Sequence, residues 1–239
     1  SCYDRKMKAV VLSVVNYSDS GCMVNLFTDE LGYVTASVKV GKRSAVRNSH
    51  LQPLSLLNVQ LKGKPSQPIM RFSECVALPE NALFAESPLK IFVLQFLAEV
   101  LNALLRNVQA DEALFDYIFT SLLHFAKMPR GIASFHLVFL VKLSRILGVF
   151  PNLENFSSGC FFDLTDACFT KNTVSSHLIL NSVQTLNFVK LLRADFDTLY
   201  LFDYSRSERN EILDYILVYF KMHTASFPEI KSLSVLREL

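Results

Sequence analysis

The sequence lacks the short motifs with which most enzymes hold a nucleophile, a phosphate group or a catalytic metal. It contains no G-x-S-x-G, no phosphate-binding glycine-rich loop and no H-E-x-x-H, and only seven glycines occur in 239 residues. The five histidines are spread along the chain. These absences argue against catalysis. A hydrolase that uses His177 or His136 with an aspartate stays open as an alternative, because a sequence cannot show whether such side chains converge in a cleft.

Close cysteine pairs are also missing. The five cysteines are odd in number and widely spaced: Cys2, Cys22, Cys75, Cys160 and Cys168. This pattern is typical of reduced thiols and predicts a cytoplasmic protein. Structural zinc sites usually contain C-x2-C pairs, so Cys160 and Cys168 with His177 downstream are more typical of buried thiols than of ligands. We predict no metal and no cofactor.

Long uncharged apolar runs are lacking as well. Apolar residues make up 51% of the chain, charged residues 19%, and the mean hydropathy is +0.28. The most apolar run, 132–150, still contains His136, Lys142 and Arg145. A bilayer-spanning helix would not readily hold these side chains at mid-depth, and the N-terminus shows no signal-type apolar core. The pattern therefore predicts large buried helices or an apolar partner-binding surface, and no membrane partner.

Acidic residues are absent from one long window, residues 31–71. The window contains seven cations: Lys39, Lys42, Arg43, Arg47, Lys62, Lys64 and Arg71. Residues 1–73 hold ten Lys and Arg against four Asp and Glu, whereas residues 74–239 hold fourteen against eighteen. The two parts thus differ in sign, which favours an anionic partner for the basic part. The alternative is a solvated polar face whose lysines deter aggregation.

The first part of the chain has the alternation and punctuation of β-structure. We expect five strands, at 8–15, 24–28, 33–40, 57–61 and 70–76, separated by turns at 18–21, 29–32 and 62–65. Five strands in about 70 residues predict a small barrel. A five-stranded OB-type barrel fits this count, and an SH3-like barrel fits nearly as well.

The period becomes helical after a boundary at 79–86. We expect helices at 89–106 after Ser87-Pro88, at 112–125 after a cap at Asp111, at 132–147, at 183–192 after a cap at Ser182, and at 206–221 after a capping box of Ser205 and Glu208. A short piece at 233–239 ends the chain, and residues 151–180 are expected to be irregular. The fold class is therefore α+β, with domains 1–79 and 80–239.

Two groups of residues are candidate binding sites. Tyr33 and Lys39 share the polar face of one strand, and Lys42, Arg43 and Arg47 follow in a loop, so an outward aromatic beside flexible cations could grip a nucleic-acid strand. Lys142 and Arg145 lie one helical turn apart among apolar residues. They could bind an acidic peptide with an apolar anchor. The alternative is a pair of long side chains extending to solvent at the edge of a helix bundle.

Segments along nearly the whole chain resemble the bacterial recombination mediator family RecO, its Bacteroidetes-type members most of all. Those in the first part are Asn16–Ser20, Leu26–Gly32, Val40–Ser44 and Leu51–Leu54. Those in the helical part are Ala133–His136, Leu143–Gly148, Cys160–Leu164, Ile212–Tyr215 and Lys231–Leu236. Their order and spacing make the resemblance specific.

The resemblance implies an OB barrel, a helical C-terminal domain, binding of single- and double-stranded DNA, and annealing of complementary strands. It implies three protein partners: RecR, the recombinase RecA and the acidic C-terminal tail of single-stranded DNA-binding protein. The DNA-contacting positions carried over are Lys39, Lys42, Arg43 and Arg47, although family members often have Gly-Ala-Arg where this chain has Gly41-Lys42-Arg43. The other window cations and Tyr33 complete the predicted DNA site.

The helical domain holds the expected tail-binding residues, Phe135, Lys142 and Arg145. Some family members carry a four-cysteine zinc module in the place of residues 151–180, where this chain has only Cys160 and Cys168. We therefore expect a degenerate module without zinc. We also expect a monomer when the protein is alone, associated with the nucleoid during repair.

Overall fold

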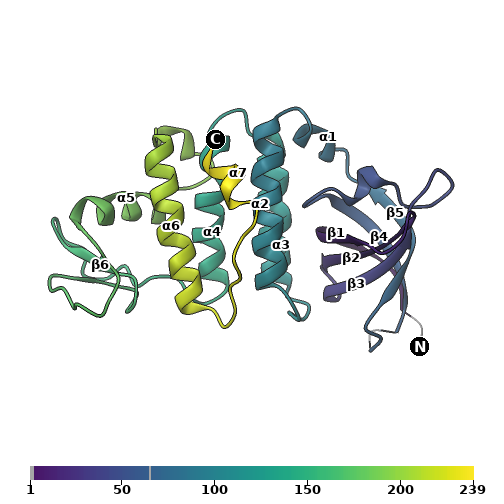
Figure 1. Ribbon diagram of the computed structural model, residues 1–239, viewed down its shortest axis with the longest axis horizontal. Helices are drawn as coiled ribbons and strands as arrows, with labels where there is room; N and C mark the ends of the chain where they lie inside the picture. Colours follow the sequence, from purple (N-terminus) through teal and green to yellow (C-terminus); the bar gives the residue numbers. More distant parts are fainter. Residues whose placement is uncertain (1–2, 65) are drawn as a thin grey trace. The chain divides into compact units, whose positions relative to one another are not determined.

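The computed structural model describes residues 3–64 and 66–239, so Cys2 and Pro65 of the predicted 62–65 turn lie outside the described residues (Figure 1). The chain forms two compact units. One comprises Ser1–Met128 with Glu229–Glu238, and the other comprises Pro129–Pro228 with Leu239. This division by compactness differs from the predicted domains 1–79 and 80–239, which stay a prediction.

The first unit begins with a closed five-stranded barrel. Its strands are β1 (Tyr3–Asn16), β2 (Gly21–Thr28), β3 (Gly32–Lys39), β4 (Leu56–Gly63) and β5 (Met70–Ala77). The strand order is β1-β2-β3-β5-β4, and β1 closes the barrel by pairing with both β2 and β4. β3 and β5 pair in parallel, whereas the other neighbours are antiparallel. The five predicted strands are confirmed, and this order is that of an OB-type barrel.

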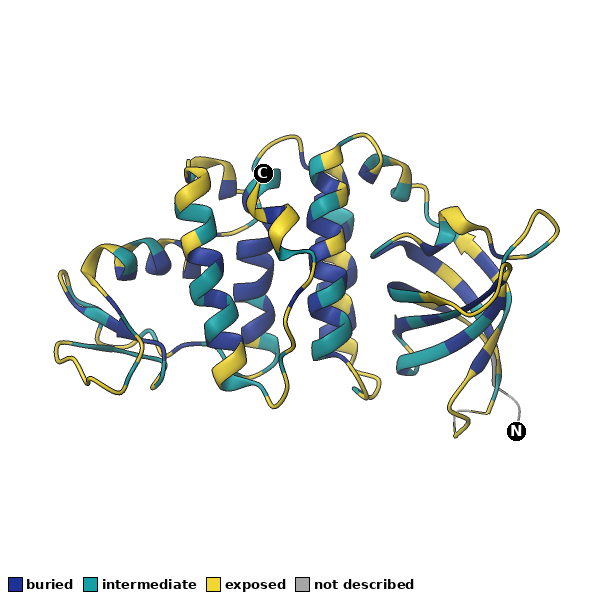
Figure 2. Ribbon diagram, in the orientation of Figure 1, coloured by how far each residue is buried: buried dark blue, intermediate teal, exposed yellow. Residues whose placement is uncertain are grey.

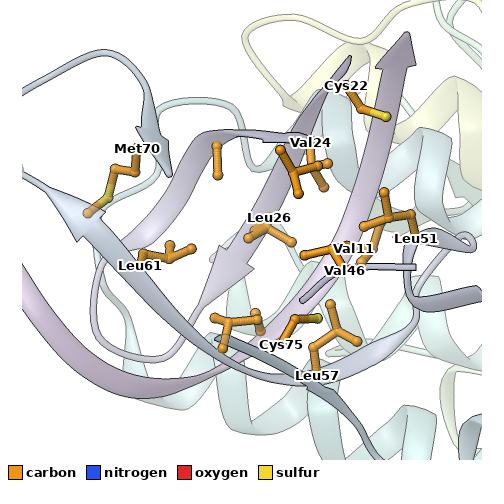
Figure 3. Close-up of a cluster of buried hydrophobic side chains, with 14 of the residues drawn as sticks. Val11, Cys22, Val24, Leu26, Val46, Leu51, Leu57, Leu61, Met70 and Cys75 are labelled. Carbon is orange, nitrogen blue, oxygen red and sulfur yellow. The ribbon is translucent and has the colours of Figure 1, made fainter. Parts of the chain in front are cut away.

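Alternation along the strands builds the barrel core. Ala9 and Val11 of β1, Val24 and Leu26 of β2, and Ala36 of β3 are completely buried and point inward. Figure 3 shows Val11, Val24 and Leu26 converging inside the barrel with side chains of β4 and β5 such as Leu57 and Met70. Because successive side chains of a strand point to opposite faces, the intervening residues form the outer surface of the barrel.

Three helices of the first unit follow the barrel: α1 (Asn81–Phe84), α2 (Pro88–Leu104) and α3 (Glu112–Lys127). The predicted cap of α3 is confirmed, because the Asp111 side chain accepts the backbone N–H of Leu114 at 3.0 Å. Helix α1 lies in the stretch 79–86, which was predicted only as a boundary. Its four residues are too few for a helical period to show in the sequence.

Helices α2 and α3 pack against one side of the barrel. Phe27 points outward from β2 but is fully buried, because its ring lies 6.1 Å from that of Phe115 in α3. The two helices are tied together by Lys90, whose ammonium group donates to the carbonyl of Ala126 at 2.7 Å near the end of α3. A cation in this place satisfies one of the carbonyl groups that a helix C-terminus leaves unpaired.

A short segment from the far end of the sequence completes the first unit. Helix α7 (Leu233–Arg237) packs on α2 (Figure 1). The Glu99 carboxylate of α2 accepts the backbone N–H groups of Lys231 at 2.5 Å and Ser232 at 3.0 Å, and the Ser232 hydroxyl donates to it at 2.7 Å. Glu99 therefore holds the backbone just before α7.

The second unit contains three helices: α4 (Phe135–Ile146), α5 (Ser182–Leu192) and α6 (Arg206–His223). Short 3-10 turns, η2 (Ile132–Ser134) and η3 (Leu199–Leu201), precede α4 and α6, as η1 (Asn48–Leu51) precedes β4 in the first unit. The predicted capping box of Ser205 and Glu208 is confirmed. The predicted cap at Ser182 is wrong, because Asn181 accepts from Val183 and Gln184 and forms a capping box with Gln184.

The expectation that residues 151–180 are irregular is wrong in part. They contain a small antiparallel sheet of β6 (Phe161–Asp163), β7 (Cys168–Thr170) and β8 (Ile179–Leu180), in the order β7-β6-β8. Strands of two or three residues are too short to show alternation in a sequence.

Across residues 3–64 and 66–239, no helix combines the length and apolar character needed to cross a membrane.

We expect Gly32→Ala to lower the free energy of unfolding by about 3 kcal/mol, measured by urea denaturation. Gly32 has a φ of +71°, and a methyl group there would overlap the backbone of Val108 and Gln109 in the α2–α3 loop. Gly148→Ala is the matched control, since Gly148 has a φ of +76° with open space around it. It should cost about 1 kcal/mol. Equal losses would contradict the close approach at Gly32.

Candidate nucleic-acid interface

The outer face of the barrel consists of rows of side chains that cross the strands. One row consists of Val15, Met23, Ser37, Arg71 and Lys62, which are register partners from β1 through β2, β3 and β5 to β4. Register partners on neighbouring strands lie about 5 Å apart and point to the same face. The row is therefore apolar at one end and cationic at the other.

A second row is polar and holds the strands in register. The Asn25 side chain donates to the Ser13 hydroxyl and accepts from the Thr35 hydroxyl, each at 2.7 Å. These three residues are register partners on β1, β2 and β3. The hydrogen bonds pair their side-chain polar groups across the strands, so this part of the outer face is built for hydration and strand alignment.

Tyr33 lies at the helix-covered end of the outer face and is partly buried, and its role as an outward aromatic for a nucleic-acid strand stays a prediction. It does share a face with Lys39, as the alternation predicted. However, Tyr33 is the register partner of the buried Phe27, and its hydroxyl donates to Asn102 of α2 at 3.0 Å. Burial is the largest influence on this phenol and raises its pKa. The ring lines a pocket of about 440 Å3 beside Met70.

The predicted cations lie at the other, open end of the barrel. All seven are exposed: Lys39, Lys42, Arg43, Arg47, Lys62, Lys64 and Arg71. Figure 2 shows that the loops of the barrel are largely exposed. Lys39 ends β3 as the register partner of Gly21. Lys62 and Arg71 are register partners in the row described above. The geometry thus brings Lys39, Lys62 and Arg71 together on the outer surface of three adjacent strands.

The loop after β3 is anchored although its cations are exposed. The hydroxyl of Ser44 donates to the carbonyl of Lys39, and the backbone N–H of Ser44 donates to Gly41 at 3.1 Å. Val46 is fully buried in the barrel core. Lys42 and Arg43 therefore extend from a loop that is fixed at both ends, and Arg47 follows directly after the buried residue.

The window cations differ from other cations of the first unit in their surroundings. Arg5 pairs with Glu30 at 3.8 Å, Lys6 with Glu74 at 3.3 Å, and Lys127 with Glu80 at 4.0 Å. Among the side chains that the structure describes, those of residues 5–64 and 66–239, none of the seven window cations has a carboxylate partner. Their charge is therefore available to an external anion.

The predicted peptide site on α4 is changed by the structure. Phe135 is fully buried and stacks on Phe196 with ring centroids 4.8 Å apart, so its predicted contact with a partner is wrong. Lys142 is half-buried and its ammonium group lies 2.5 Å from Asp195. That hydrogen bond is the main reason why the pKa of Asp195 is lowered. Arg145 is exposed and lies over the Phe150 ring at 4.2 Å.

His136, one candidate for catalysis, lies in the core. Burial, followed by the charge of Arg209, lowers its pKa to about 3. The residue is therefore neutral at physiological pH and buried away from solvent. This placement removes it from the hydrolase hypothesis.

His177, the other candidate, does meet an aspartate. Its Nδ1 lies 2.6 Å from Asp163, and Asp163 also accepts the backbone N–H groups of Thr165 at 2.9 Å and Asp166 at 3.1 Å. Asp163 thus organises the turn between β6 and β7. The neighbouring thiol of Cys168 has a raised pKa, through burial first and then the charges of Asp163 and Asp166, which is opposite to what a nucleophilic thiol requires. The pair is better explained by a structural role.

Metal-binding side chains come together at the same turn. Ligand atoms of Asp163, Asp166 and His177 lie within 4.8 Å of one another, the one such group of three within the described residues. Cys160 is buried, Cys168 is partly buried, and both are free thiols outside this group. The described cysteines therefore do not assemble a zinc site of the kind that the module would need.

The apolar part of the open face was not predicted from the sequence. Val15 and Met23 occupy the row beside the cations, and Tyr17 follows in the β1–β2 turn. Val15 and Tyr17 are 60% and 59% exposed. The alternation of β1 could have assigned Val15 to the outer face. However, a bulge between Val11 and Ser13 shifts the register, so the alternation cannot be followed through the strand.

A closed OB-type barrel with unpaired cations on its open face, followed by helices, is the architecture of a class of proteins that handle nucleic acid. Family models for the N-terminal and C-terminal parts of recombination protein O match residues 4–78 and 85–233. The chain therefore belongs to the RecO family of DNA repair proteins.

Individual relatives agree with the family models along the whole chain. The chain is 34% identical to the DNA repair protein RecO of Phocaeicola vulgatus over 237 residues, which cover 98% of each protein. It is 32% identical to that of Bacteroides fragilis over 238 residues and 31% identical to that of Azobacteroides pseudotrichonymphae over 237 residues, again with 98% of each chain covered. The resemblance to Bacteroidetes-type members is confirmed.

We expect His177→Asn to destabilise the second unit in a pH-dependent way. The hydrogen bond to Asp163 raises the pKa of His177. Burial opposes ionisation of Asp163, but the His177 hydrogen bond and two backbone N–H groups together lower its pKa. The histidine contribution is complete below its unfolded pKa and is lost as the pH rises through the raised value. The aspartate contribution is lost as the pH falls through the lowered value.

The difference in urea midpoint between the wild type and His177→Asn should therefore be largest at about pH 5 and smaller at about pH 9. Asp163→Asn is the matched partner, because an amide retains an oxygen for the turn. In the Asp163→Asn background, the effect of His177→Asn should lose most of its pH dependence, because only Asp166, 3.7 Å from His177, still raises the pKa of the histidine. A pH-independent difference in the wild-type background would exclude the ion pair.

Proposed function

We propose that this chain is a non-enzymatic mediator of DNA repair and recombination that binds single- and double-stranded DNA through the open face of its barrel and promotes strand annealing. The observation that carries the proposal is the group of seven exposed window cations without a described carboxylate partner. A protein that folds while leaving these charges unpaired retains their full attraction for phosphates. Membership of the RecO family supports the same role.

The mechanism that we propose is electrostatic. Lys39, Lys62 and Arg71 offer a fixed set of charges on three strands, and Lys42, Arg43 and Arg47 extend it along the loop. Cations that neutralise phosphates release the condensed counterions of the nucleic acid, and this release drives binding without reading sequence. Two complementary strands held with their charges screened can approach and pair. No bond is broken, so the function needs no catalytic group.

We also propose protein partners and a cellular location. The partners are RecR, the recombinase RecA and the acidic tail of single-stranded DNA-binding protein, and the mediator helps to load recombinase onto protein-coated strands. We place the protein, monomeric when alone, in the cytoplasm and at the nucleoid during repair. The second unit would hold the acidic tail, with Arg145 as the exposed cation and the Phe150 ring beneath it as an apolar neighbour.

A second candidate function is an adaptor whose barrel does not bind DNA. The pairing of Lys142 with Asp195 shows that cations of this chain do form internal ion pairs. The adaptor hypothesis predicts a tail-binding protein whose affinity for oligonucleotides is low and insensitive to salt. The two functions are therefore separated by the same titration.

Replacing Lys39, Arg43 and Arg47 together by alanine should weaken binding of a labelled single-stranded oligonucleotide and flatten its salt dependence. Each phosphate contact contributes about −0.7 to the slope of log K against log salt on single strands, so the slope should decrease in magnitude by about two. Fluorescence anisotropy at several salt concentrations measures both quantities.

The matched control for this experiment removes the same charge from cations that are already paired. Arg5→Ala, Lys6→Ala and Lys127→Ala together should leave the slope unchanged, because Glu30, Glu74 and Glu80 compete for these side chains. Equal slopes for the two triple variants would remove the loop from the site. Absence of binding by the wild type at low salt would leave the adaptor function.

Arg145→Ala should weaken binding of an acidic tail peptide at least about tenfold, the effect of losing one hydrogen bond to a charged group. Lys142→Ala should have a smaller effect, because Asp195 holds that ammonium group. Asp195→Asn releases Lys142 and should strengthen binding. Isothermal titration calorimetry measures all three, with Lys221→Ala, an exposed cation of α6, as the control. An unchanged affinity for Arg145→Ala would place the peptide elsewhere.

A further inference from the structure

Tyr17 is an exposed aromatic residue at the start of the β1–β2 turn, directly after the end of β1. Its backbone N–H donates to the carbonyl of Gly21 at 3.0 Å, and the Gly21 N–H donates to the Ser18 hydroxyl at 2.8 Å. These bonds close the turn on both sides of the residue. The backbone position of Tyr17 is thus fixed, although 59% of the residue is exposed.

The ring of Tyr17 is oriented by the glycine that ends the turn. A methyl group on Gly21 would overlap ring atoms of Tyr17, so the ring lies directly against the backbone at this position. Because Gly21 has no side chain, one part of the ring can approach the backbone closely, and more than half of the residue stays exposed to solvent. Such a ring loses little conformational freedom when a flat partner stacks on it.

The surroundings of Tyr17 combine apolar surface with positive charge. Gly21, on which the ring lies, is the register partner of Lys39, and Val40 donates its N–H to Ser20 of the same turn at 2.7 Å. Val15 and Met23 form the apolar end of the neighbouring row, which continues to Arg71. A ring and an apolar surface therefore lie about one strand spacing from unpaired cations.

We propose that Tyr17 is a base-stacking residue for single-stranded nucleic acid, with Val15 and Met23 extending the surface on which the bases lie. This inference rests on the proposed function and adds a contact that the cations cannot supply. Every base has a flat π-face, so stacking is tolerant of sequence, and the turn between the first two strands is one of the places where OB barrels receive oligonucleotides. Phosphates of the same strand would then meet Lys39 and the loop after it.

The absence of tryptophan from the chain gives this proposal a direct test. Tyr17→Trp places a single indole at the proposed site, and an unlabelled oligothymidylate should quench its fluorescence to saturation. Val76→Trp is the control, because Val76 is 60% exposed on β5 in a pocket that none of the window cations lines. Lys6 and Lys8 line this pocket together with Asp29 and Glu74, and Glu74 pairs with Lys6. Its fluorescence should stay unchanged. Quenching at position 76 alone, or at neither position while anisotropy reports binding, would overturn the proposal.

Affinity measurements separate stacking from a structural role in the turn. Tyr17→Ala and Tyr17→Leu should each weaken single-strand binding about tenfold, whereas Tyr17→Phe should stay within about twofold, because only a ring retains the π-face. The salt slope should be unchanged in all three, since stacking releases no counterions. If Tyr17→Leu binds like the wild type, the ring acts only by filling space, and the proposal fails.

The outcomes distinguish this inference from the proposed function. Steep, salt-dependent binding that is unaffected by Tyr17→Ala would overturn the stacking role and leave the DNA-binding function in place. Absence of oligonucleotide binding by the wild type at low salt would overturn both. Gly21→Ala gives an independent test: it removes the space for the ring, so it should weaken binding as Tyr17→Ala does while Tyr17 itself is retained.

Discussion

Closure of the barrel by β1 is the constraint on which the first unit depends. β1 pairs with β2 on one side and with β4 on the other, so every strand of the barrel has two neighbours and a defined inside and outside. Part of the outer face is covered by helices α2 and α3, and the rest is open. Phe27 and Tyr33 lie in the row beneath α2 and α3, whereas Met23 and Ser37 lie in an open row. One strand pair thus supplies both a packing surface and the proposed binding surface.

The open surface offers two kinds of interaction, and these act over different distances. Charges act over about 10 Å at moderate salt and bring a polyanion to the barrel from any direction. Apolar and aromatic contacts act only at touching distance and require the bases to be turned toward the protein. Arg71 and Met23 lie in the same row with Ser37 between them, so both kinds of interaction are available to one strand of nucleic acid.

Sequence patterns predicted the strands and long helices because their periods extend over many residues. They indicated the seven cations because these residues lie in one window of the sequence, residues 31–71, that contains no acidic residue. They could not show which outward residues are covered, because cover comes from helices that are distant in sequence. Tyr33 and Lys39 have the same parity on β3, yet Tyr33 meets Asn102 of α2 and Lys39 stays exposed.

Phe135 illustrates the same limit on a helix. It was chosen as a candidate by its region of the sequence, but only the fold shows that Phe196 stacks on its ring. The Lys142–Asp195 pair likewise joins residues 53 positions apart. The small sheet at β6 to β8 was missed for a different reason, since strands of two or three residues have no readable period.

The contact of Glu99 with Lys231 and Ser232 has a consequence for biosynthesis. The second unit is inserted into the sequence of the first, whose final piece, Glu229–Glu238, follows it. A ribosome that delivers the chain from its N-terminus therefore releases the barrel and α2 long before the segment that packs on α2. During that interval the α7 site on α2 is uncovered. The first unit therefore cannot be completed until residues 129–228 of the second unit have been translated.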